Sequence, residues 1–200
     1  MISKAELSGI VDAMGAGTPN EIQEIVGELA YIRNEDIPDP SEIKELCRTA
    51  LKDHQIEAVS SNEVTVADTR EAVEVGEAED GNVGYYYIPG PNAFPEIPSE
   101  MSEVIDILKL SKREVDMGKV VKSFSARLKR RATSLKNKID SFTTTHPTPD
   151  DIAKLEKRYS DLINVYYDYD FWLPGELLNM EDMISNVSEK LELLKSGICN

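Results

Sequence analysis

The sequence predicts a mainly helical protein with a small antiparallel β-sheet, built from a winged-helix-like N-terminal domain and a C-terminal antiparallel helical bundle. Two observations predict this. Three short segments before residue 54 repeat apolar residues at helical spacing, and runs of β-branched and aromatic residues follow them. After residue 99, longer segments repeat apolar residues every three and four positions, which is typical of packed helices. We therefore expect one domain in residues 1–98 and a second in residues 99–200.

The three N-terminal segments each begin with a helix-capping signal. In each, a Ser, Thr or Asp precedes a glutamate by three positions, and in two of them proline occupies the first helical position. The pairs are Ser3 with Glu6, Thr18 with Glu21, and Asp39 with Glu42. Because apolar residues at offsets of zero, three, four and seven follow every signal, we expect three short helices that pack on one another.

Three short strands are predicted after these helices. Residues 56–59 and 63–66 flank the turn 60–62 and are expected to form a hairpin. The run GYYYI at residues 84–88 is expected to return as a third strand, because aromatic and β-branched residues suit a pleated surface. The acidic stretch 68–82 between them is predicted to be a surface loop. Three helices followed by a small sheet is the element order of a winged-helix domain.

A proline-rich crossover ends the N-terminal domain. Residues 89–98 contain four prolines and a glycine, so no regular hydrogen-bond ladder can persist there. Phe94 and Ile97 are its large apolar residues, and we expect them to fix the crossover to a core.

The C-terminal half is predicted to be a bundle. Ser99 is expected to cap a short helix, and a much longer helix is expected over residues 111–142. The long helix carries apolar residues seven apart, at Val121, Leu128, Leu135 and Phe142. Helices starting at Thr148 and at about Pro174 repeat the alternation of threes and fours, so the three long helices are expected to pack antiparallel.

Four stretches carry a resemblance that covers nearly the full length. They read ELSGIVD at 6–12, ELA at 28–30, PGPNAFPEIP at 89–98 and YDYDFWLP at 167–174. On these residues the chain resembles an uncharacterised protein family of halophilic archaea, and the proline-rich stretch is the most specific of the four. The resemblance implies a cytoplasmic archaeal protein and implies no activity.

The composition is strongly acidic. With 37 acidic and 22 basic side chains the formal net charge is -15, which opposes generic binding to nucleic acid or anionic membranes and suits a salty cytoplasm. No stretch approaches the roughly 18 consecutive apolar residues of a membrane span, and the N-terminus lacks the apolar core of a signal peptide. Cys47 and Cys199 do not suggest a disulfide framework. We therefore expect a cytoplasmic protein that does not bind membranes.

One helix is basic inside this acidic chain. Residues 111–142 carry ten basic and three acidic side chains. The candidate contacts for nucleic acid or a partner lie mostly off its apolar stripe, at Lys122, Arg127, Lys129, Arg130, Arg131 and Lys136. These charges either pair with the acidic helices and solvent, or contact DNA or RNA phosphates, or lie on a membrane surface. The first interpretation is favoured.

Two further segments are candidates for interaction. The third N-terminal helix, residues 41–52, would be the recognition helix of a winged-helix domain, but its exposed face mixes acids and bases, which argues weakly against insertion into DNA. Near residue 170 an aromatic hinge is expected to close the end of the bundle, and its Tyr167, Tyr169 and Trp172 are a candidate interaction patch.

Catalytic, cofactor and metal signals are weak in this sequence. His54 and His146 stand alone, and the chain has no Gly-rich phosphate loop, HExxH or GxSxG motif. Asp168 and Asp170 are too few to hold a cation without partners from elsewhere. We therefore expect no catalytic residues, no cofactor and no bound metal.

These observations favour a non-enzymatic protein-interaction or regulatory protein with an unidentified protein partner. The alternative is a DNA-binding transcriptional regulator that uses the basic helix, residues 119–138, or the third N-terminal helix. An enzyme is the third hypothesis. Heptad seams left uncovered within one chain would indicate a homodimer.

Overall fold

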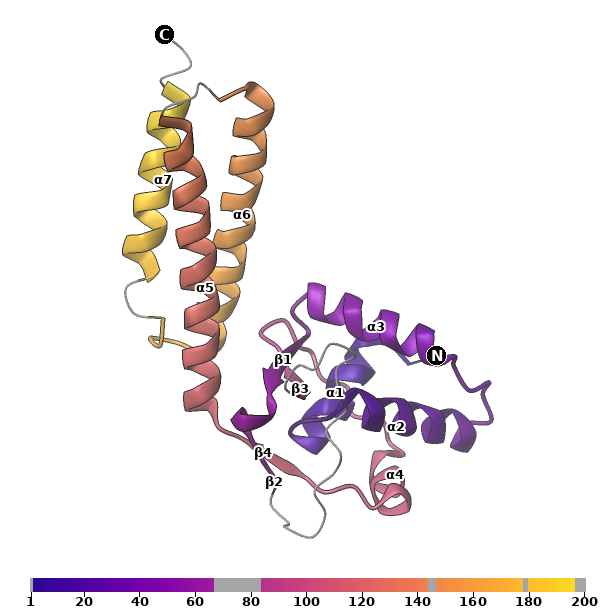
Figure 1. The fold of residues 1–200 in the computed structure, drawn as a ribbon. Coiled ribbons are helices and arrows are strands. Elements are labelled where there is room, and N and C mark those ends of the chain that lie inside the picture. The colour runs from indigo at the N-terminus through magenta and orange to yellow at the C-terminus, as the bar shows by residue number, and fades with distance from the viewer. Residues whose placement is uncertain (1, 67–83, 144–146, 178–179, 197–200) are drawn as a thin grey trace. The chain divides into compact units, whose positions relative to one another are not determined.

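Seven α-helices and four short β-strands make up most of the part of the chain that the structure, a computed structural model, describes (Figure 1). It describes residues 2–66, 84–143, 147–177 and 180–196. The predicted fold class, mainly helical with a small antiparallel sheet, is confirmed. The chain divides into two compact units, Met1–Val120 and Val121–Asn200.

The first three helices begin where the capping signals predict. They are α1 (Lys4–Met14), α2 (Pro19–Ile32) and α3 (Pro40–Lys52), and each has a complete capping box. Their apolar faces form the core of the first unit, which includes Leu7, Ile10, Ile22, Leu29 and Cys47. Local side-chain chemistry therefore sets where these helices start, and burial of one face packs them together.

The predicted hairpin between residues 56–59 and 63–66 is wrong. Strand β1 (Ile56–Ser60) pairs antiparallel with β3 (Tyr85–Pro89), and β2 (Val64–Val66) pairs with β4 (Arg113–Val115). Between β1 and β2 the chain makes a 3-10 turn, η1 (Ser61–Glu63), in which a Glu63 carboxylate oxygen accepts the Ser60 N–H at 2.7 Å. The turn carries the chain onward instead of reversing it, so each strand finds a later partner.

Strand β3 is confirmed and also forms a bridge with Gly17, between α1 and α2. The order Gly17, β3, β1 places a residue from the helical segment at the edge of the small sheet. The winged-helix assignment stays a prediction, and the loop predicted at 68–82 lies outside the described residues.

The proline-rich crossover is held by its backbone. Phe94 is 79% exposed and Ile97 is 55% exposed, so the expectation that they fix it to a core is wrong. Instead the Glu96 N–H donates to the Ala5 carbonyl at 3.0 Å. A Cβ at Gly9 would lie 2.2 Å from the Glu96 carbonyl oxygen, so only glycine allows α1 to approach the crossover this closely.

The first unit continues beyond residue 98, where the sequence predicts a domain boundary. Helix α4 (Met101–Leu108) packs on α2, and its Met101 and Val104 are buried in the core of the first unit. Its N-cap is Glu100 and not Ser99. Since β4 pairs with β2, the whole segment up to Val120 belongs to the first unit.

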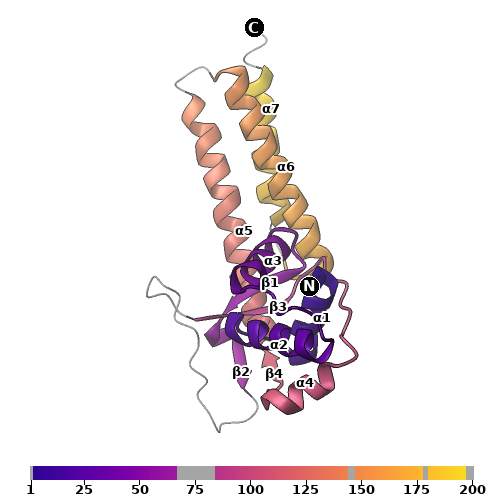
Figure 2. The same ribbon diagram turned by 90° about the vertical axis from the view of Figure 1, so that its right-hand side faces the viewer.

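The second unit is formed by α5 (Met117–Asp140), of which residues from 121 onward belong here, α6 (Pro149–Trp172) and α7 (Met180–Ser196). Figures 1 and 2 show these helices side by side, each antiparallel to the one before it. Their buried residues include Phe124, Leu128 and Leu135 of α5, Leu155 and Leu162 of α6, and Ile184 and Leu191 of α7.

Two predicted helix starts are wrong in this half. The long helix begins at Met117 and not at residue 111 or 112, because residues 113–115 form β4 and Asp116 accepts the Lys119 N–H at 3.1 Å. The last helix begins at Met180 and not near Pro174. The α6 start is confirmed, with Thr148 and Asp151 forming a capping box.

Candidate functional site

The cations of α5 lie on two sides of its apolar stripe. At about 100° per residue, Arg127, Arg131 and Ser134 flank the buried Phe124, Leu128 and Leu135 on one side. Lys122, Lys129 and Lys136, which are seven apart, flank it on the other. The six predicted contact residues therefore do not form a single surface.

Helix α6 adds cations that the sequence analysis missed. Lys154, Lys157 and Arg158 stand at spacings of three and four, so they share one face near the start of α6. All three are exposed, while Leu155 and Leu162 on the same helix are buried. The spacing of these three residues in the sequence predicts that they share a face of the helix. Only the packing of α6 against α5 shows that this face adjoins the cations of α5.

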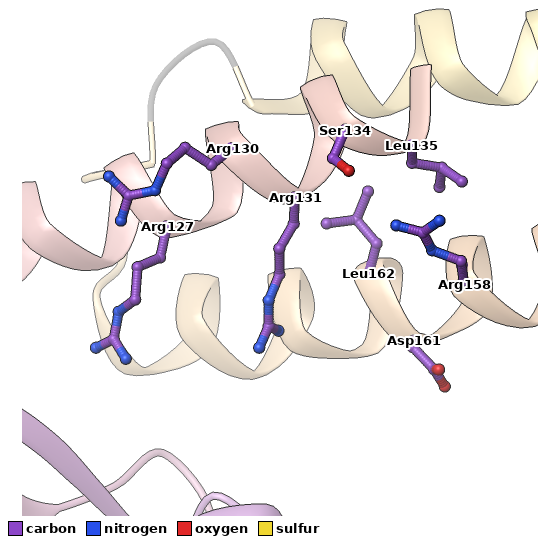
Figure 3. Close-up of a pocket in the computed structure, with 8 residues that line it drawn as sticks. All are labelled: Arg127, Arg130, Arg131, Ser134, Leu135, Arg158, Asp161 and Leu162. Carbon is purple, nitrogen blue, oxygen red and sulfur yellow. The ribbon is translucent and has the colours of Figure 1, made fainter. Parts of the chain in front are cut away.

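A first hollow of about 550 Å³ lies between α5 and α6. Figure 3 shows Arg127 and Arg131 extending from α5 toward the side of α6, while Arg158 extends from α6 toward Leu135. The other residues that line the hollow are Arg130, Ser134, Asp161 and Leu162. Four guanidinium groups and one carboxylate thus surround a partly apolar floor.

A second hollow of about 390 Å³ shares Arg158 and Asp161 with the first. Its other lining residues are Lys138, Phe142, Asp151, Lys154, Leu155 and Lys157. We call the two hollows together the cationic groove. Lys129 lines a third hollow of about 460 Å³, which shares Arg130 and Ser134 with the first and is also lined by Thr133 and Asn137. Lys122 and Lys136 line none of the three.

Carboxylates neutralise few of the groove cations. Lys154 pairs with Asp150 at 2.5 Å, whereas Arg130, Arg131 and Arg158 have no ion pair among the described residues. Asp151 already serves the α6 cap, where hydrogen bonds from Thr148, first from its side chain and then its backbone, hold the pKa of its carboxyl below the ordinary value. The groove is therefore a site of concentrated positive charge that suits an anion.

Arg127 differs from the other groove arginines. Its guanidinium carbon lies 4.0 Å from the centroid of the Phe124 ring, so part of its charge faces an aromatic side chain of the core. A similar contact joins Lys138 to Phe142, with the amine 5.1 Å from the ring centroid. The latter pair lines the second hollow, which brings a cation and an aromatic ring to one surface.

The predicted aromatic patch is divided by the structure. Tyr169 is 4% exposed and its ring packs 4.8 Å from that of Phe124, measured between centroids, while Trp172 is half-buried 5.6 Å from Phe124. Tyr167 is 65% exposed. Phe171, which the sequence analysis did not single out, is 85% exposed. Use of the patch for interaction stays a prediction, and Tyr167 is its exposed member.

The remaining candidates offer little chemistry. Within the described ranges, no group of three His, Cys, Asp or Glu side chains could hold a metal ion. His54 contacts Glu57, and His146 and Cys199 lie outside the described residues. Burial raises the pKa of the Cys47 thiol to about 11, so it stays protonated and unreactive near neutral pH.

The third N-terminal helix, α3, presents a partly neutralised surface. Its Arg48 pairs with Glu45 at 2.5 Å, and both side chains are exposed. A cation held by a neighbouring carboxylate is less available to phosphates, so α3 is a weaker candidate than the groove.

Comparison with known proteins found one matching protein family. A model described as "Family of unknown function (DUF7109)" matches residues 5–189. Searches of curated proteins and of solved structures found no match. In the described part of the chain, no helix combines the length and the apolar character needed to cross a membrane. The halophilic archaeal origin implied by the resemblance stays a prediction.

Proposed function

The chain belongs to this family of unknown function, and from the geometry of its second unit we propose that it is a non-enzymatic nucleic-acid-binding protein that acts in the cytoplasm. The proposed contact is between the cationic groove and the phosphate backbone. The sequence predicted, as its alternative, DNA binding by the basic helix or the third N-terminal helix. The proposed contact is instead the surface shared by α5 and α6.

The observation that carries the proposal is the pair Arg131 and Arg158. They come from different helices, line one hollow, and have no carboxylate partner among the described residues. Four guanidinium groups with a single carboxylate, Asp161, in the same hollow repel one another, and an anion that binds among them relieves this repulsion. Guanidinium groups also suit phosphate, since their planar fork donates two parallel hydrogen bonds.

The distribution of charge supports a confined contact. Residues 1–120 carry a net charge of -15, whereas residues 121–200 carry twelve basic and twelve acidic side chains. A strongly acidic first unit repels nucleic acid, so binding is expected only where cations are locally in excess. The groove meets that requirement, with seven cations and two carboxylates among its lining residues.

The test is equilibrium binding of a fluorescent 20-nucleotide oligomer, followed by anisotropy at 50 and 200 mM salt. Changing both Arg131 and Arg158 to Gln is expected to weaken binding roughly tenfold or more, because each charged hydrogen bond contributes about 1.5–3 kcal/mol. The matched control changes Lys122 and Lys136 to Gln, which removes the same charge from α5 outside the groove. The control is expected to stay within about twofold of the wild type.

Two results would reject the proposal. One is no binding by the wild type even at 50 mM salt. The other is equal weakening by the groove pair and the control pair, which would mean that overall charge matters and the groove does not.

Docking of a protein partner is the second candidate. It is supported by Tyr167 and Phe171, which are 65% and 85% exposed and stand four residues apart on α6, so they are neighbours on its surface. Exposed aromatic side chains concentrate at interfaces. If the partner is a second copy of this chain, sedimentation velocity will find self-association that the double change of Tyr167 and Phe171 to Ser abolishes.

A further inference from the structure

We infer that Phe142 is a stacking surface for a nucleobase, and that the cationic groove therefore takes single-stranded nucleic acid. This inference rests on the proposed function and specifies its ligand. Phe142 lies in η2 (Ser141–Thr143), directly after α5, and it lines the second hollow with Lys138 and Arg158.

The second hollow combines an aromatic ring, on which a base can stack, with cations that can bind a phosphate. Phe142 is half-buried, so its ring is held in place while part of it still faces the hollow, and the buried Leu155 lies in the same wall. Lys138, Lys157 and Arg158 line the hollow around these apolar groups. Base-to-ring stacking beside backbone cations is the common design of single-strand binding sites.

The shape of the groove excludes a duplex from this contact. A helix that reads duplex DNA must project into the major groove, whereas the groove-facing side of α5 is flanked by α6 (Figure 3). In a duplex, moreover, both faces of each base are already stacked, so Phe142 has no free face to contact. A hollow of about 390 Å³ accepts a group of small-ligand size, such as one base with its sugar.

The length of the groove limits the footprint. Arg127 and Lys138 are eleven residues apart on α5, which corresponds to roughly 16 Å along the helix. At the spacing of about 3.4 Å per nucleotide of a stacked strand, this distance covers at most about five phosphates, and fewer if the strand is extended. The inferred ligand is therefore a short single-stranded segment with one base on Phe142.

The experiment compares four fluorescent 12-mers of matched length: single-stranded DNA, single-stranded RNA, duplex DNA, and a DNA strand with abasic sites. Changing Phe142 to Leu is expected to weaken the better-bound single strand by roughly 5- to 100-fold, since stacking on one aromatic ring contributes that much. Binding of the abasic strand is expected to be the same for the wild type and this variant. The duplex is expected to bind the wild type at least tenfold more weakly than the single strand.

Two variants control for structure. Phe142→Tyr keeps an aromatic ring and is expected to bind as the wild type does. Phe171→Leu removes a ring that is 85% exposed and outside the hollows, and it is expected to have no effect. Fluorescence of Trp172, the only tryptophan, reports whether the second unit of each variant is folded.

A measurement on the unaltered protein keeps the inference testable if Phe142→Leu fails to fold. An oligomer containing 5-iodouracil is cross-linked by light and the attached peptide is identified by mass spectrometry. Attachment at Phe142 supports the inference, and attachment only at other positions overturns it. Weaker binding of either single-stranded DNA or single-stranded RNA by Phe142→Leu also supports the inference. The strand that the wild type binds more tightly identifies the kind of ligand.

The failure of this inference is distinct from the failure of the proposed function. If Phe142→Leu binds single strands as the wild type does, or the duplex binds equally well, the stacking role is wrong while phosphate binding stands. If the wild type binds none of the four oligomers at 50 mM salt, both are wrong.

Discussion

Arg113 and Glu21 form a buried bidentate ion pair although 92 positions separate them in the sequence. Arg113 Nη1 donates to Glu21 Oε2 at 2.9 Å and to the Ala16 carbonyl at 3.0 Å, and Nη2 donates to Glu21 Oε1. The guanidinium carbon also lies 5.1 Å from the centroid of the Tyr86 ring. This one side chain joins β4 to the start of α2 and to the small sheet, and so links the end of the first unit to its beginning.

Replacement of Arg113 should strongly destabilise the folded protein. Arg113→Met is expected to lower the free energy of unfolding by about 3–5 kcal/mol, because Glu21 would remain buried without its cation. Urea denaturation followed by far-ultraviolet circular dichroism measures the change. The control is Arg48→Met, which breaks an exposed pair and should leave the urea midpoint unchanged. Equal midpoints for the two variants would contradict a structural role for the buried pair.

Acid should weaken the first unit through Arg33. Hydrogen bonds from Arg33 lower the pKa of Glu100 from 4.5 to about 2, and for Glu6 the hydrogen bonds from Ser3 and Arg33 outweigh the effect of burial, which raises the pKa. Both carboxylates therefore stabilise the folded state fully above about pH 4.5, and this contribution is lost as the pH falls below that value, for Glu100 toward about 2.

The prediction is a smaller acid sensitivity in Arg33→Gln than in the wild type. Urea midpoints measured at pH 7, 5, 4 and 3 should fall less steeply with pH in the variant, because the hydrogen bonds by which Arg33 lowers the pKa of Glu100 and Glu6 are gone. Parallel curves would show that the acid sensitivity comes from other groups.

Gly9 should not tolerate a methyl group. Gly9→Ala is expected to lower the free energy of unfolding by about 1–3 kcal/mol, because the added Cβ would lie 2.2 Å from the Glu96 carbonyl oxygen. Gly27→Ala in α2 is the matched control, since its nearest contact would be Ile37 Cγ2 at 3.9 Å. The control is expected to raise stability by about 0.5–1 kcal/mol. Thermal and urea denaturation of both variants measure these changes. Destabilisation by Gly27→Ala and not by Gly9→Ala would contradict the prediction.

Replacement of Tyr167 and of Tyr169, both in α6, should affect stability differently. Tyr169→Ala is expected to cost about 3–5 kcal/mol of unfolding free energy, because the ring is buried against Phe124. Tyr167→Ala is expected to stay within about 0.5 kcal/mol, since that side chain is largely exposed. Trp172 fluorescence in a urea titration reports both. Similar stabilities would mean that the aromatic cluster does not support the second unit.

Salt should weaken the proposed nucleic-acid binding in proportion to the phosphates that are contacted. If four groove cations contact a single strand, a plot of log affinity against log salt is expected to have a slope of about −3. Changing both Arg131 and Arg158 to Gln should reduce the magnitude of that slope by about 1.4. Anisotropy titrations from 50 to 400 mM salt measure it, and an unchanged slope would mean that these two arginines do not contact phosphates.

Much of the fold could be predicted from the sequence because the signals are local. The capping pairs that begin at Ser3, Thr18 and Asp39 act over three residues, and the apolar spacing of α5 and α6 acts over one or two turns. The strand at Tyr85 was found for the same reason, from its aromatic run. The error at the start of α5 came from a residue pairing that no local signal contains, between β4 and β2.

The sequence by itself thus determined the helices, the third strand and the excess of positive charge on one long segment. Only the tertiary structure decided which strands pair, that Phe94 is exposed, and that Arg158 and Arg131 line one hollow. Helices and caps depend on neighbours within about four residues, whereas strand partners and a groove between two helices depend on contacts between distant residues. The candidate site is of the second kind, so the sequence could identify its basic helix but not the groove.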